Sequence, residues 1–304
     1  MSGQKKKAVV TGGAGFIGAN LAEELLKEGY EVHIVDNLSG GKRENVPADA
    51  VFHEKDINDT DAIRGIFQGA QFVFHLAALP RVPFSIDYPQ ESHEANADGT
   101  LSVLVAAKDA KVGRVIYSAS SSAYGDQETL PLSETMPPKA MHPYGLQKWI
   151  GEEYCRIFSS VYGLETVSLR YFNIYGPKLN PEGAYALVIG IFLRQKKANE
   201  PLTITGDGEK TRDFTHVSDA VRANILAATS GKVGTGEVIN VGAGRNVSIN
   251  YLASLFGGPT VHIPPRIEAQ DSLADIRKAK ELLGWEPTVA LEDGIAELKK
   301  LFGV

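Results

Sequence analysis

The stretch that decides the fold runs from residue 8 to residue 29 and reads AVVTGGAGFIGANLAEELLKEG. Its apolar start predicts a short strand, TGGAGFIG at 11–18 predicts a glycine turn, and the remainder predicts a helix that stops at a glycine. In this setting the glycines are typical of a dinucleotide-binding fingerprint. Gly12 would allow the tight turn, Gly15 the approach of backbone to a pyrophosphate, and Gly18 close packing of helix on strand. Phe16 and Ile17 open the helix, whose N-terminus attracts phosphates.

The second predicted strand, YEVHIVD, ends in Asp36, which lies 18 residues beyond Gly18. An acid at this position accepts hydrogen bonds from the adenosine ribose and repels a 2′-phosphate, which favours NAD over NADP. Asp36 could instead be only a turn residue that opens DNLSGGKREN. The fingerprint upstream favours the binding role.

Tyr144 and Lys148 stand four residues apart in YGLQK, and 24 positions before Tyr144 the segment SASSSAYG contains Ser120. Apolar residues recur at three- and four-residue steps from Leu146 to Val161, which predicts a helix with the phenol and the ammonium on one face. A neighbouring Lys⁺ lowers the pKa of a phenol, and such a phenol can accept a proton from a hydroxyl near neutral pH. A YxxxK pair alone is usually an ordinary exposed pair, so its weight here comes from the fingerprint.

Composition narrows the class of protein. The 304 residues are 43% hydrophobic and 22% charged, as in a globular chain with a large core. A net charge of −6 is not the overall positive charge that is typical of nucleic-acid-binding proteins. No apolar run approaches the length of a membrane span, the first one is too short for a signal peptide, and the single cysteine, Cys155, can form no internal disulfide. We therefore expect a cytoplasmic protein with no membrane partner, and we predict no metal site.

Strand-like runs alternate with helical segments in the first half of the chain. They lie at 51–56, 71–78, 113–120 and 165–173, and this alternation predicts an α/β fold, a Rossmann doubly wound parallel sheet. After about residue 176, Pro and Gly separate shorter elements, which predicts a second, smaller, discontinuous α/β lobe. The predicted division gives 1–173 plus 216–243 to the NAD-binding domain and 174–215 plus 244–304 to the substrate lobe.

The chain resembles the extended short-chain dehydrogenase/reductase family, and within it the nucleotide-sugar 4-epimerases. The resemblance runs nearly end to end, through TGGAGFIG, DNLSGG, HLAA, SASSSAYGD, PYGLQK, LRYFNIYGP, GDGEKTRDFTHV, VINVGAG and DSLADIRKAKELLGWEP. It implies that Ser120, Tyr144 and Lys148 are catalytic, and that Lys148 also pairs with the nicotinamide ribose. The other residues that it implies for NAD are Asn37, Ser39, Asp56, Ile57, Leu76, Ala77, Ala78, Asn96, Ser118 and Tyr171. Asn96 could instead be a helix-packing amide.

On the substrate side, the resemblance implies a UDP-sugar whose diphosphate needs fixed cations. Arg212 in TRDF matches the phosphate-binding arginine of the family, and Arg266 is the candidate for the second. The chain departs from the family pattern here, because PPRIEAQDSLAD is about one residue shorter than the usual tract. The remaining predicted substrate residues are Arg81, Ser121, Ser122, Tyr144, Asn173, Ala186, Leu187, Val188, Thr203, Thr205 and Ser272.

The residues after Ser120 select among the reactions of the family. Dehydratase relatives carry Asp-Glu or Glu there, and decarboxylating relatives also use a Glu, whereas this chain has Ser121 and Ser122. Simple epimerisation needs no such carboxylate. The resemblance thus implies that Tyr144, bridged by Ser120, removes the proton of the sugar's 4-hydroxyl, while NAD takes and returns hydride through a bound 4-keto sugar.

One position bears on the sugar. In the SLAD segment, relatives restricted to glucose and galactose carry Tyr where this chain has Ser272, and a Ser leaves room for an acetamido group. This favours UDP-N-acetylglucosamine as substrate. UDP-glucose alone and a UDP-uronate remain open, with Arg81 the one candidate cation for a uronate. A non-catalytic NAD-binding regulator is disfavoured because the catalytic residues are present. The resemblance also implies a homodimer through helices near 90–110 and 143–162.

Overall fold

The computed structural model describes residues 5–182, 187–265 and 268–304. Its centre is a seven-stranded sheet of order β11-β6-β5-β4-β1-β2-β3, in which every neighbouring pair is parallel. The chain builds outward from β1 on one side and then on the other, which is the predicted doubly wound arrangement. The strands are β1 (Lys7–Thr11), β2 (Glu31–Asp36), β3 (Val51–Glu54), β4 (Ala70–His75), β5 (Arg114–Ser120), β6 (Glu165–Tyr171) and β11 (Thr235–Val241).

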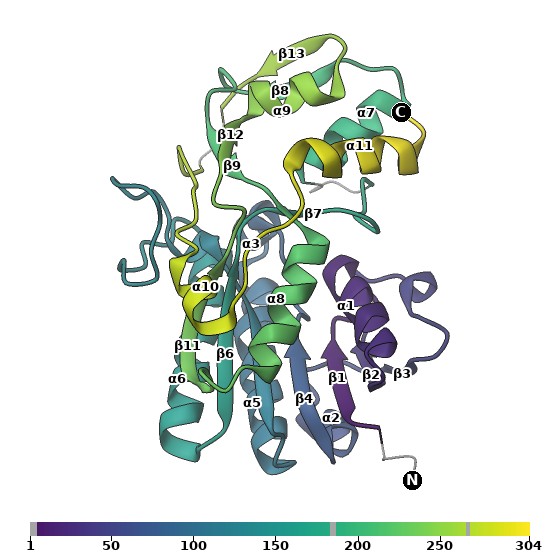
Figure 1. Ribbon diagram of the computed structural model, residues 1–304, viewed down its shortest axis with the longest axis vertical. Coiled ribbons are helices and arrows are strands. Elements are labelled where there is room, and N and C mark those ends of the chain that lie inside the picture. Colours follow the sequence, from purple (N-terminus) through teal and green to yellow (C-terminus); the bar gives the residue numbers. More distant parts are fainter. Residues whose placement is uncertain (1–4, 183–186, 266–267) are drawn as a thin grey trace.

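Helices cover both faces of the sheet (Figure 1). One apolar cluster joins the sheet to α1 (Phe16–Lys27), α8 (Val217–Thr229) and α10 (Arg277–Leu283). A second cluster joins the other face to α2 (Thr60–Phe67), α5 (Gly99–Asp109) and α6 (Pro143–Tyr162). Short helices lie between β4 and α5, namely α3 (Val82–Asp87), α4 (Pro89–His93) and η2 (Glu94–Asp98), and others are η1 (Arg43–Asn45) and η3 (Ser121–Ala123).

The smaller lobe lies at the C-terminal end of the strands, at the top of Figure 1. Its core joins α7, α9 and α11 to β8. Two-stranded pairs complete it: β8 with β13 (parallel), β9 with β12 (antiparallel), and β7 with β10 (parallel). The bounds are β7 (Ile174–Tyr175), α7 (Val188–Lys197), β8 (Leu202–Thr205), β9 (Thr211–Asp213), β10 (Thr215–His216), β12 (Asn246–Ser248), α9 (Ile249–Phe256), β13 (Thr260–Ile263) and α11 (Leu291–Phe302).

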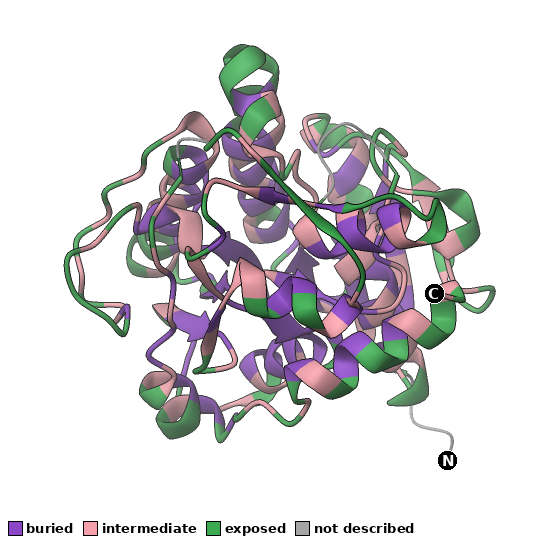
Figure 2. Ribbon diagram, turned by 90° about the horizontal axis from the view of Figure 1, so that it is seen from above, coloured by how far each residue is buried: buried purple, intermediate pink, exposed green. Residues whose placement is uncertain are grey.

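Burial follows these layers. Seen from above, the strands in the middle of the molecule are buried, and exposed residues lie on the segments around and in front of them (Figure 2). The central strands β1 and β5 are buried almost throughout, because helices cover both of their faces. In the described residues no helix has both the length and the apolar character that crossing a membrane requires.

The predicted alternation of strands and helices is confirmed, and so is the helix that carries YGLQK, which spans Pro143–Tyr162. The predicted division into two lobes stays a prediction. The assignment of α10 to the smaller lobe fits poorly, because α10 packs on β11 and α8 of the sheet domain. Trp285 is fully buried in the same cluster, although the sequence had placed this segment in the smaller lobe.

Candidate active site

The turn between β1 and α1 leaves no room for a side chain at Gly12 or Gly18. Gly12 has a φ of 71°, and a Cβ there would lie 2.6 Å from a backbone nitrogen of the loop after β4. A Cβ on Gly18 would overlap the Gly12 carbonyl, so the helix packs directly on the turn. Gly15 precedes α1 without a side-chain cap, so Phe16 and Ile17 begin the helix with N–H groups free for a ligand. This cradle fits the pyrophosphate of a dinucleotide.

Asp36 is the last residue of β2, and its carboxylate is bonded to the glycine turn. One oxygen accepts the Ala14 N–H at 3.0 Å, and the other accepts the Leu38 N–H at 2.8 Å. Burial raises the pKa of Asp36, and the two N–H donors act against that rise. The carboxylate is therefore held at the edge of the sheet where the ribose of a dinucleotide on the turn would meet it.

Four more residues predicted for NAD lie near one another. Asn37 donates to the Asp56 carboxylate at 2.8 Å and accepts from the Ser39 hydroxyl at 2.7 Å. Ile57 is buried and packs in the core beside α5. The structure thus brings these residues together at the ends of β2 and β3.

The loop after β4 is bonded to the end of β1. The Leu76 N–H donates to the Thr11 carbonyl at 3.1 Å, and the Ala77 N–H donates to the Thr11 hydroxyl at 3.3 Å. The ring of His75 contacts the hydroxyls of Thr11 at 2.8 Å and Thr100 at 3.0 Å. Burial lowers the pKa of His75 to about 3, so the ring is uncharged near pH 7 and connects the hydroxyls of Thr11 and Thr100. Sequence analysis missed His75, although it lies in HLAA; Ala78 continues the same loop.

Asn96 holds that loop from the helix side. Its side-chain oxygen accepts the Leu79 N–H at 2.8 Å, and its nitrogen donates to the Leu79 carbonyl at 3.2 Å. The amides of Asn96 and Gln147 lie 2.8 Å apart, and both residues are buried. Asn96 is therefore occupied by protein groups, as in the packing alternative, and its contact with a ribose stays a prediction. Gln147, on the catalytic helix, was missed from the sequence.

The helix α6 has clear start and stop signals. Pro143 is its first residue, and the His142 ring accepts the Gly145 N–H at 3.1 Å as a cap. The helix ends at Tyr162 and is followed by Gly163, which has a φ of 70°. These signals place Tyr144 in the first turn and Lys148 one turn later, beside the end of β5.

Tyr144 lies next to Ser120, the last residue of β5. The Ser120 hydroxyl acts on the phenol, whose pKa it lowers, and it accepts the Ser122 N–H at 3.2 Å. The Tyr144 N–H donates to the Ser85 hydroxyl at 3.1 Å, which fixes the start of α6 against α3. The structure thus brings the predicted serine and tyrosine to the same place, and their catalytic roles stay a prediction.

Lys148 is buried beneath the same site. Its ammonium donates to the Ser118 carbonyl at 2.8 Å and lies 4.9 Å from the centre of the Tyr117 ring. The Ser118 hydroxyl and the Tyr171 phenol, both predicted for NAD, lie 3.3 Å apart. Burial lowers the pKa of Lys148 to about 8.

The charge that acts on the Tyr144 phenol is an unexpected one. Burial raises the pKa of Tyr144, whereas the Ser120 hydroxyl and the charge of Arg81 lower it. Sequence analysis had assigned the lowering to Lys148. In the structure the cation that lowers the pKa of the phenol is Arg81.

A buried ion pair supports the catalytic helix from below. Arg170 on β6 binds Glu152 on α6 through two contacts, at 2.8 and 2.6 Å. Both side chains are buried, and the guanidinium lies 4.4 Å from the centre of the Tyr124 ring. Removing one partner would leave an uncompensated buried charge, so this pair locks α6 onto the sheet. No motif in the sequence indicated it.

On the substrate side, Arg212 lies on β9, and its side chain is bonded to other groups of the protein. Its guanidinium pairs with Glu268 at 3.0 Å and donates to the carbonyls of Ala269 and Gln270 at 2.9 and 3.0 Å. Lys210 lies 3.5 Å from the same Glu268 carboxylate. A diphosphate at this position would have to take the place of Glu268.

Buried Asp213 connects the other predicted substrate residues. Its carboxylate accepts N–H groups of Ala243 at 2.6 Å and Ala274 at 3.0 Å, and burial raises its pKa to about 6. Asn173 donates to the Asp213 carbonyl at 2.9 Å, and the Ser272 N–H donates to the carbonyl of the residue before Arg212 at 3.1 Å. Asn173, Arg212 and Ser272 are therefore gathered around one residue that sequence analysis did not single out.

The remaining substrate predictions are spread more widely. Ser121 and Ser122 form η3, directly after Ser120. Thr203 lies on β8, where the Gln195 amide bonds both its N–H and its hydroxyl. Thr205 ends β8, and Leu187 and Val188 start α7. In the described parts of the chain no hydrogen bond or ion pair joins these four lobe residues to the catalytic group. Ala186 and Arg266 lie outside the described residues.

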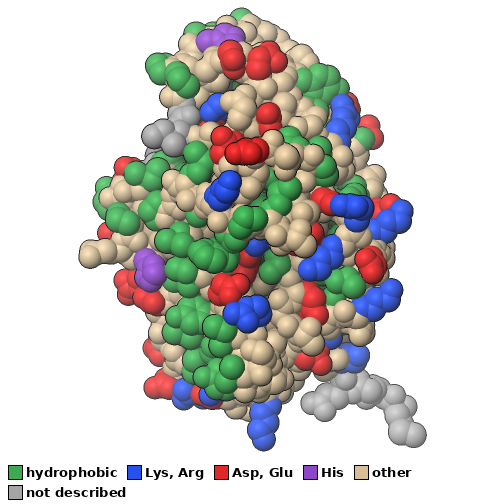
Figure 3. All heavy atoms as spheres, turned by 90° about the vertical axis from the view of Figure 1, so that its left-hand side faces the viewer, with side chains coloured by type: hydrophobic (Ala, Val, Ile, Leu, Met, Phe, Trp, Pro, Cys, Tyr) green, Lys and Arg blue, Asp and Glu red, His purple; other side chains and the backbone are tan. Residues whose placement is uncertain are grey.

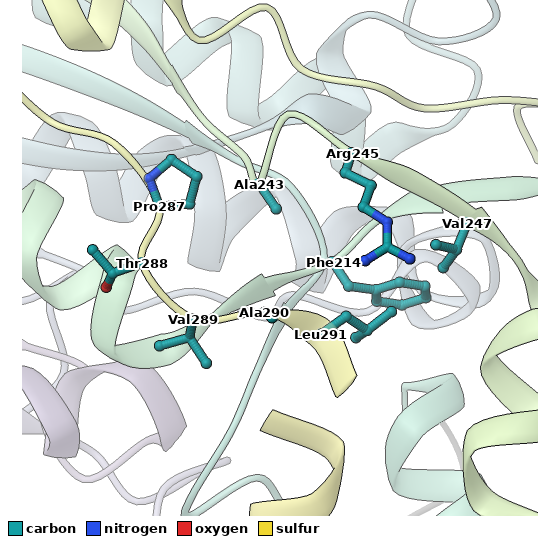
Figure 4. A pocket seen from close by; sticks show the side chains of 9 residues that line it. All are labelled: Phe214, Ala243, Arg245, Val247, Pro287, Thr288, Val289, Ala290 and Leu291. Atoms are coloured by element: carbon teal, nitrogen blue, oxygen red, sulfur yellow. The ribbon is translucent and has the colours of Figure 1, made fainter. Parts of the chain in front are cut away.

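A separate hollow of about 240 Å³ lies between the loop after β11 and the segment before α11 (Figure 4). Arg245, a charged residue that lines it, is paired with Glu292 at 2.8 Å. None of the predicted catalytic or binding residues lines it. We therefore place the active site at the strand ends and not in this hollow.

The doubly wound sheet, the glycine turn and the Ser–Tyr–Lys group define a dinucleotide-dependent enzyme of the dehydrogenase/reductase type. The chain belongs to the NAD dependent epimerase/dehydratase family, which matches residues 8–242. NAD is accordingly its cofactor, as predicted.

Three similar proteins cover nearly the whole chain. A putative UDP-glucose 4-epimerase of Methanocaldococcus jannaschii is 36% identical over 94% of this chain and 95% of its own length. The UDP-glucose 4-epimerase of Thermotoga maritima, solved with UDP-glucose, has a TM-score of 0.92 and 39% identity over 97% of this chain and 99% of its own. The UDP-N-acetylglucosamine 4-epimerase of Methanobrevibacter ruminantium, in complex with UDP-N-acetylmuramic acid, has a TM-score of 0.93 and 35% identity over 98% of each chain.

Proposed function

We propose that this enzyme interconverts 4-epimers of UDP-hexoses and that its preferred substrate is UDP-N-acetylglucosamine. The observation on which the reaction type rests is the residue sequence after Ser120, the neighbour of Tyr144. Two neutral residues, Ser121 and Ser122, follow it directly. Elimination and decarboxylation in the resembling enzymes need a carboxylate where this chain has serine. The relatives named as 4-epimerases support the same reaction.

The chain's own residues can carry out the proton transfer at the sugar's 4-hydroxyl. Tyr144, in its ionised form, accepts the proton of the sugar's 4-hydroxyl, and Ser120 lies between as a hydrogen-bonding bridge. Lys148, held on the Ser118 carbonyl, is placed to orient a ribose beside the phenol. NAD, when bound, supplies the oxidation and the reduction at carbon 4. Because Tyr144 returns the proton after the sugar has turned, no external acid or oxidant is consumed.

The choice of sugar rests on Ser272. It is buried, and its backbone is bonded to β9 next to Arg212. A small residue at this position leaves space that the tyrosine of glucose-restricted relatives would fill. Comparing kcat/KM for UDP-N-acetylglucosamine and UDP-glucose tests the choice. A clear preference for UDP-glucose would contradict it.

The contact of Glu268 with Arg212 predicts an effect on UDP binding. Glu268→Gln removes the carboxylate that competes with the diphosphate for Arg212 and Lys210. Calorimetry with UDP should therefore give a several-fold lower Kd, since one charge pair of this kind contributes about 1 kcal/mol. Glu286→Gln, at a pair remote from Arg212, is the control and should bind UDP like the parent. Weaker binding by Glu268→Gln would mean that the diphosphate does not bind at Arg212.

A homodimer through α5 and α6 is the proposed assembly. Along α6 the apolar side chains of Ile157, Val161 and Tyr162 are 38%, 66% and 55% exposed. Figure 3 faces the side of the molecule on which α6 lies, and hydrophobic side chains gather low on that face. Such a patch is typical of a contact with a second chain.

Val161→Asp should convert this dimer to a monomer at micromolar concentration, measured by light scattering after gel filtration. Leu301→Asp is the matched control, because Leu301 is similarly exposed, at 59%, but lies on α11. A parent protein that is already monomeric would refute the proposed assembly.

A further inference from the structure

The carboxylate of Asp213 is fully buried at the end of β9 and is bonded to two other segments of the chain. One oxygen accepts the Ala243 N–H at 2.6 Å, and the other accepts the N–H groups of Gly244 and Ala274, each at 3.0 Å. Burial raises the pKa of this carboxyl to about 6, so the group is ionised near pH 7. In the described parts of the chain no cation pairs with it, so these N–H groups compensate its buried charge.

The two segments bonded to this carboxylate lie on opposite sides of β9. Residues 243–244 belong to the loop between β11 and β12, and β12 pairs with β9 on one side. Ala274 belongs to a stretch that runs along the other side, where Thr211 of β9 pairs with Asp271. The Asp213 carboxylate therefore joins the strand to both of its neighbours.

Arg212 and Ser272, which we expect at the diphosphate and the sugar, lie on the two partners of this second pairing. The Arg212 guanidinium donates to the Gln270 carbonyl at 3.0 Å. The Ser272 N–H donates to the Thr211 carbonyl at 3.1 Å. The distance between Arg212 and Ser272 thus depends on how closely β9 and the neighbouring segment lie together, and the carboxylate of Asp213 holds them at one end.

A carboxylate is well matched to this position. It offers two acceptor oxygens, and both are used, whereas an asparagine offers one and would turn its NH₂ group toward an N–H donor. The three segments are also in close contact. A Cβ on Gly242 would overlap the Ala274 side chain and lie 2.9 Å from an oxygen of Asp213.

We propose that Asp213 is a positioning residue, whose carboxylate fixes β9 against the segment around Ser272 and so sets the spacing between Arg212 and Ser272. The inference rests on the proposed function for the contact of Arg212 with the diphosphate. Without these hydrogen bonds the strand and the segment can separate, and the two residues then no longer fit one nucleotide sugar. The catalytic group lies on β5 and α6, so the effect should appear in binding and not in the chemical step.

The first test is calorimetry with UDP on the NAD-containing protein, without any sugar. Asp213→Ala removes both acceptor oxygens and should raise the Kd by about tenfold, the effect expected when a charge-assisted hydrogen bond is lost. Asp213→Asn keeps the shape and one acceptor, so it should raise the Kd by about threefold. It is also the variant to use if Asp213→Ala does not fold.

Asp219→Ala is the matched control. The Asp219 carboxylate is also buried and accepts the N–H groups of Thr288 at 3.0 Å and Val289 at 3.1 Å, but these residues belong to the segment before α11. Its loss should lower the thermal stability and leave the Kd for UDP unchanged. The proposal is overturned if both Asp213 variants bind UDP like the parent, or if Asp219→Ala weakens binding equally.

Steady-state rates on the sugar that is turned over give a second readout. Asp213→Ala should raise KM by about tenfold and leave kcat nearly unchanged, as expected for a loss of binding alone. A lower kcat with an unchanged KM would contradict the proposal. A parent that binds UDP but epimerises no UDP-sugar would refute the proposed function, while the calorimetry would still test Asp213. A parent that does not bind UDP would overturn both.

Discussion

Replacing Tyr144 by phenylalanine is expected to lower the rate of epimerisation by about 10²–10⁴-fold, the usual effect of removing a proton-transfer group. The change deletes one oxygen. The stacking of the residue 144 ring on His142 remains, and so does the backbone bond to Ser85. The loss should therefore appear in kcat while the fold and the retained dinucleotide are unchanged.

Steady-state rates and the absorbance of the bound dinucleotide check this expectation together. Tyr154→Phe is the control, because Tyr154 lies on the same helix away from its first turn and packs against the sheet's core. If Tyr144→Phe keeps an activity within about threefold of the parent, the loss is far smaller than expected, and Tyr144 is not the base.

Ser272→Tyr should remove activity on the acetamido sugar and spare UDP-glucose. Ser272 is buried beside β9, so a phenol in its place cannot move into solvent without displacing the chain. Extra bulk in a packed wall costs about 1–3 kcal/mol. Since about 1.4 kcal/mol corresponds to one decade, the ratio of the two kcat/KM values should change by roughly tenfold or more.

Ser272→Ala is the matched variant, because it keeps the space and removes only the hydroxyl. It should retain both activities, and UDP binding should be similar in both variants. Equal losses on the two sugars in Ser272→Tyr would mean that Ser272 does not line the sugar pocket. The acetamido assignment would then lose its main support.

The fold could be predicted because its determinants are local. The helix over 143–162 is marked by a proline start, a glycine stop and apolar periodicity, and the structure reproduces those limits. The glycine turn likewise follows from spacing alone. The packing of the segment around Trp285 on the sheet could not be predicted, because it depends on contacts with β11 and α8 that no local pattern contains.

The site residues that sequence analysis missed act through long-range contacts. Asp213 gathers backbone groups from segments near 243 and 274, and Arg170 finds Glu152 only after β6 pairs with β5. Ser85, which accepts the Tyr144 N–H, lies on α3, a helix too short to be read from periodicity. Each partner is remote in sequence, so residue type and spacing could not indicate the pairs. The engagement of Arg212 by Glu268 belongs to the same class.

The most direct test of the central claim is to incubate the purified protein with UDP-N-acetylglucosamine, without added NAD, and to resolve the nucleotide sugars by proton NMR. The account predicts a mixture of UDP-N-acetylglucosamine and UDP-N-acetylgalactosamine that reaches the same ratio from either side. Conversion only when NAD is added in proportion to the sugar would contradict it, and so would a dehydrated or decarboxylated product.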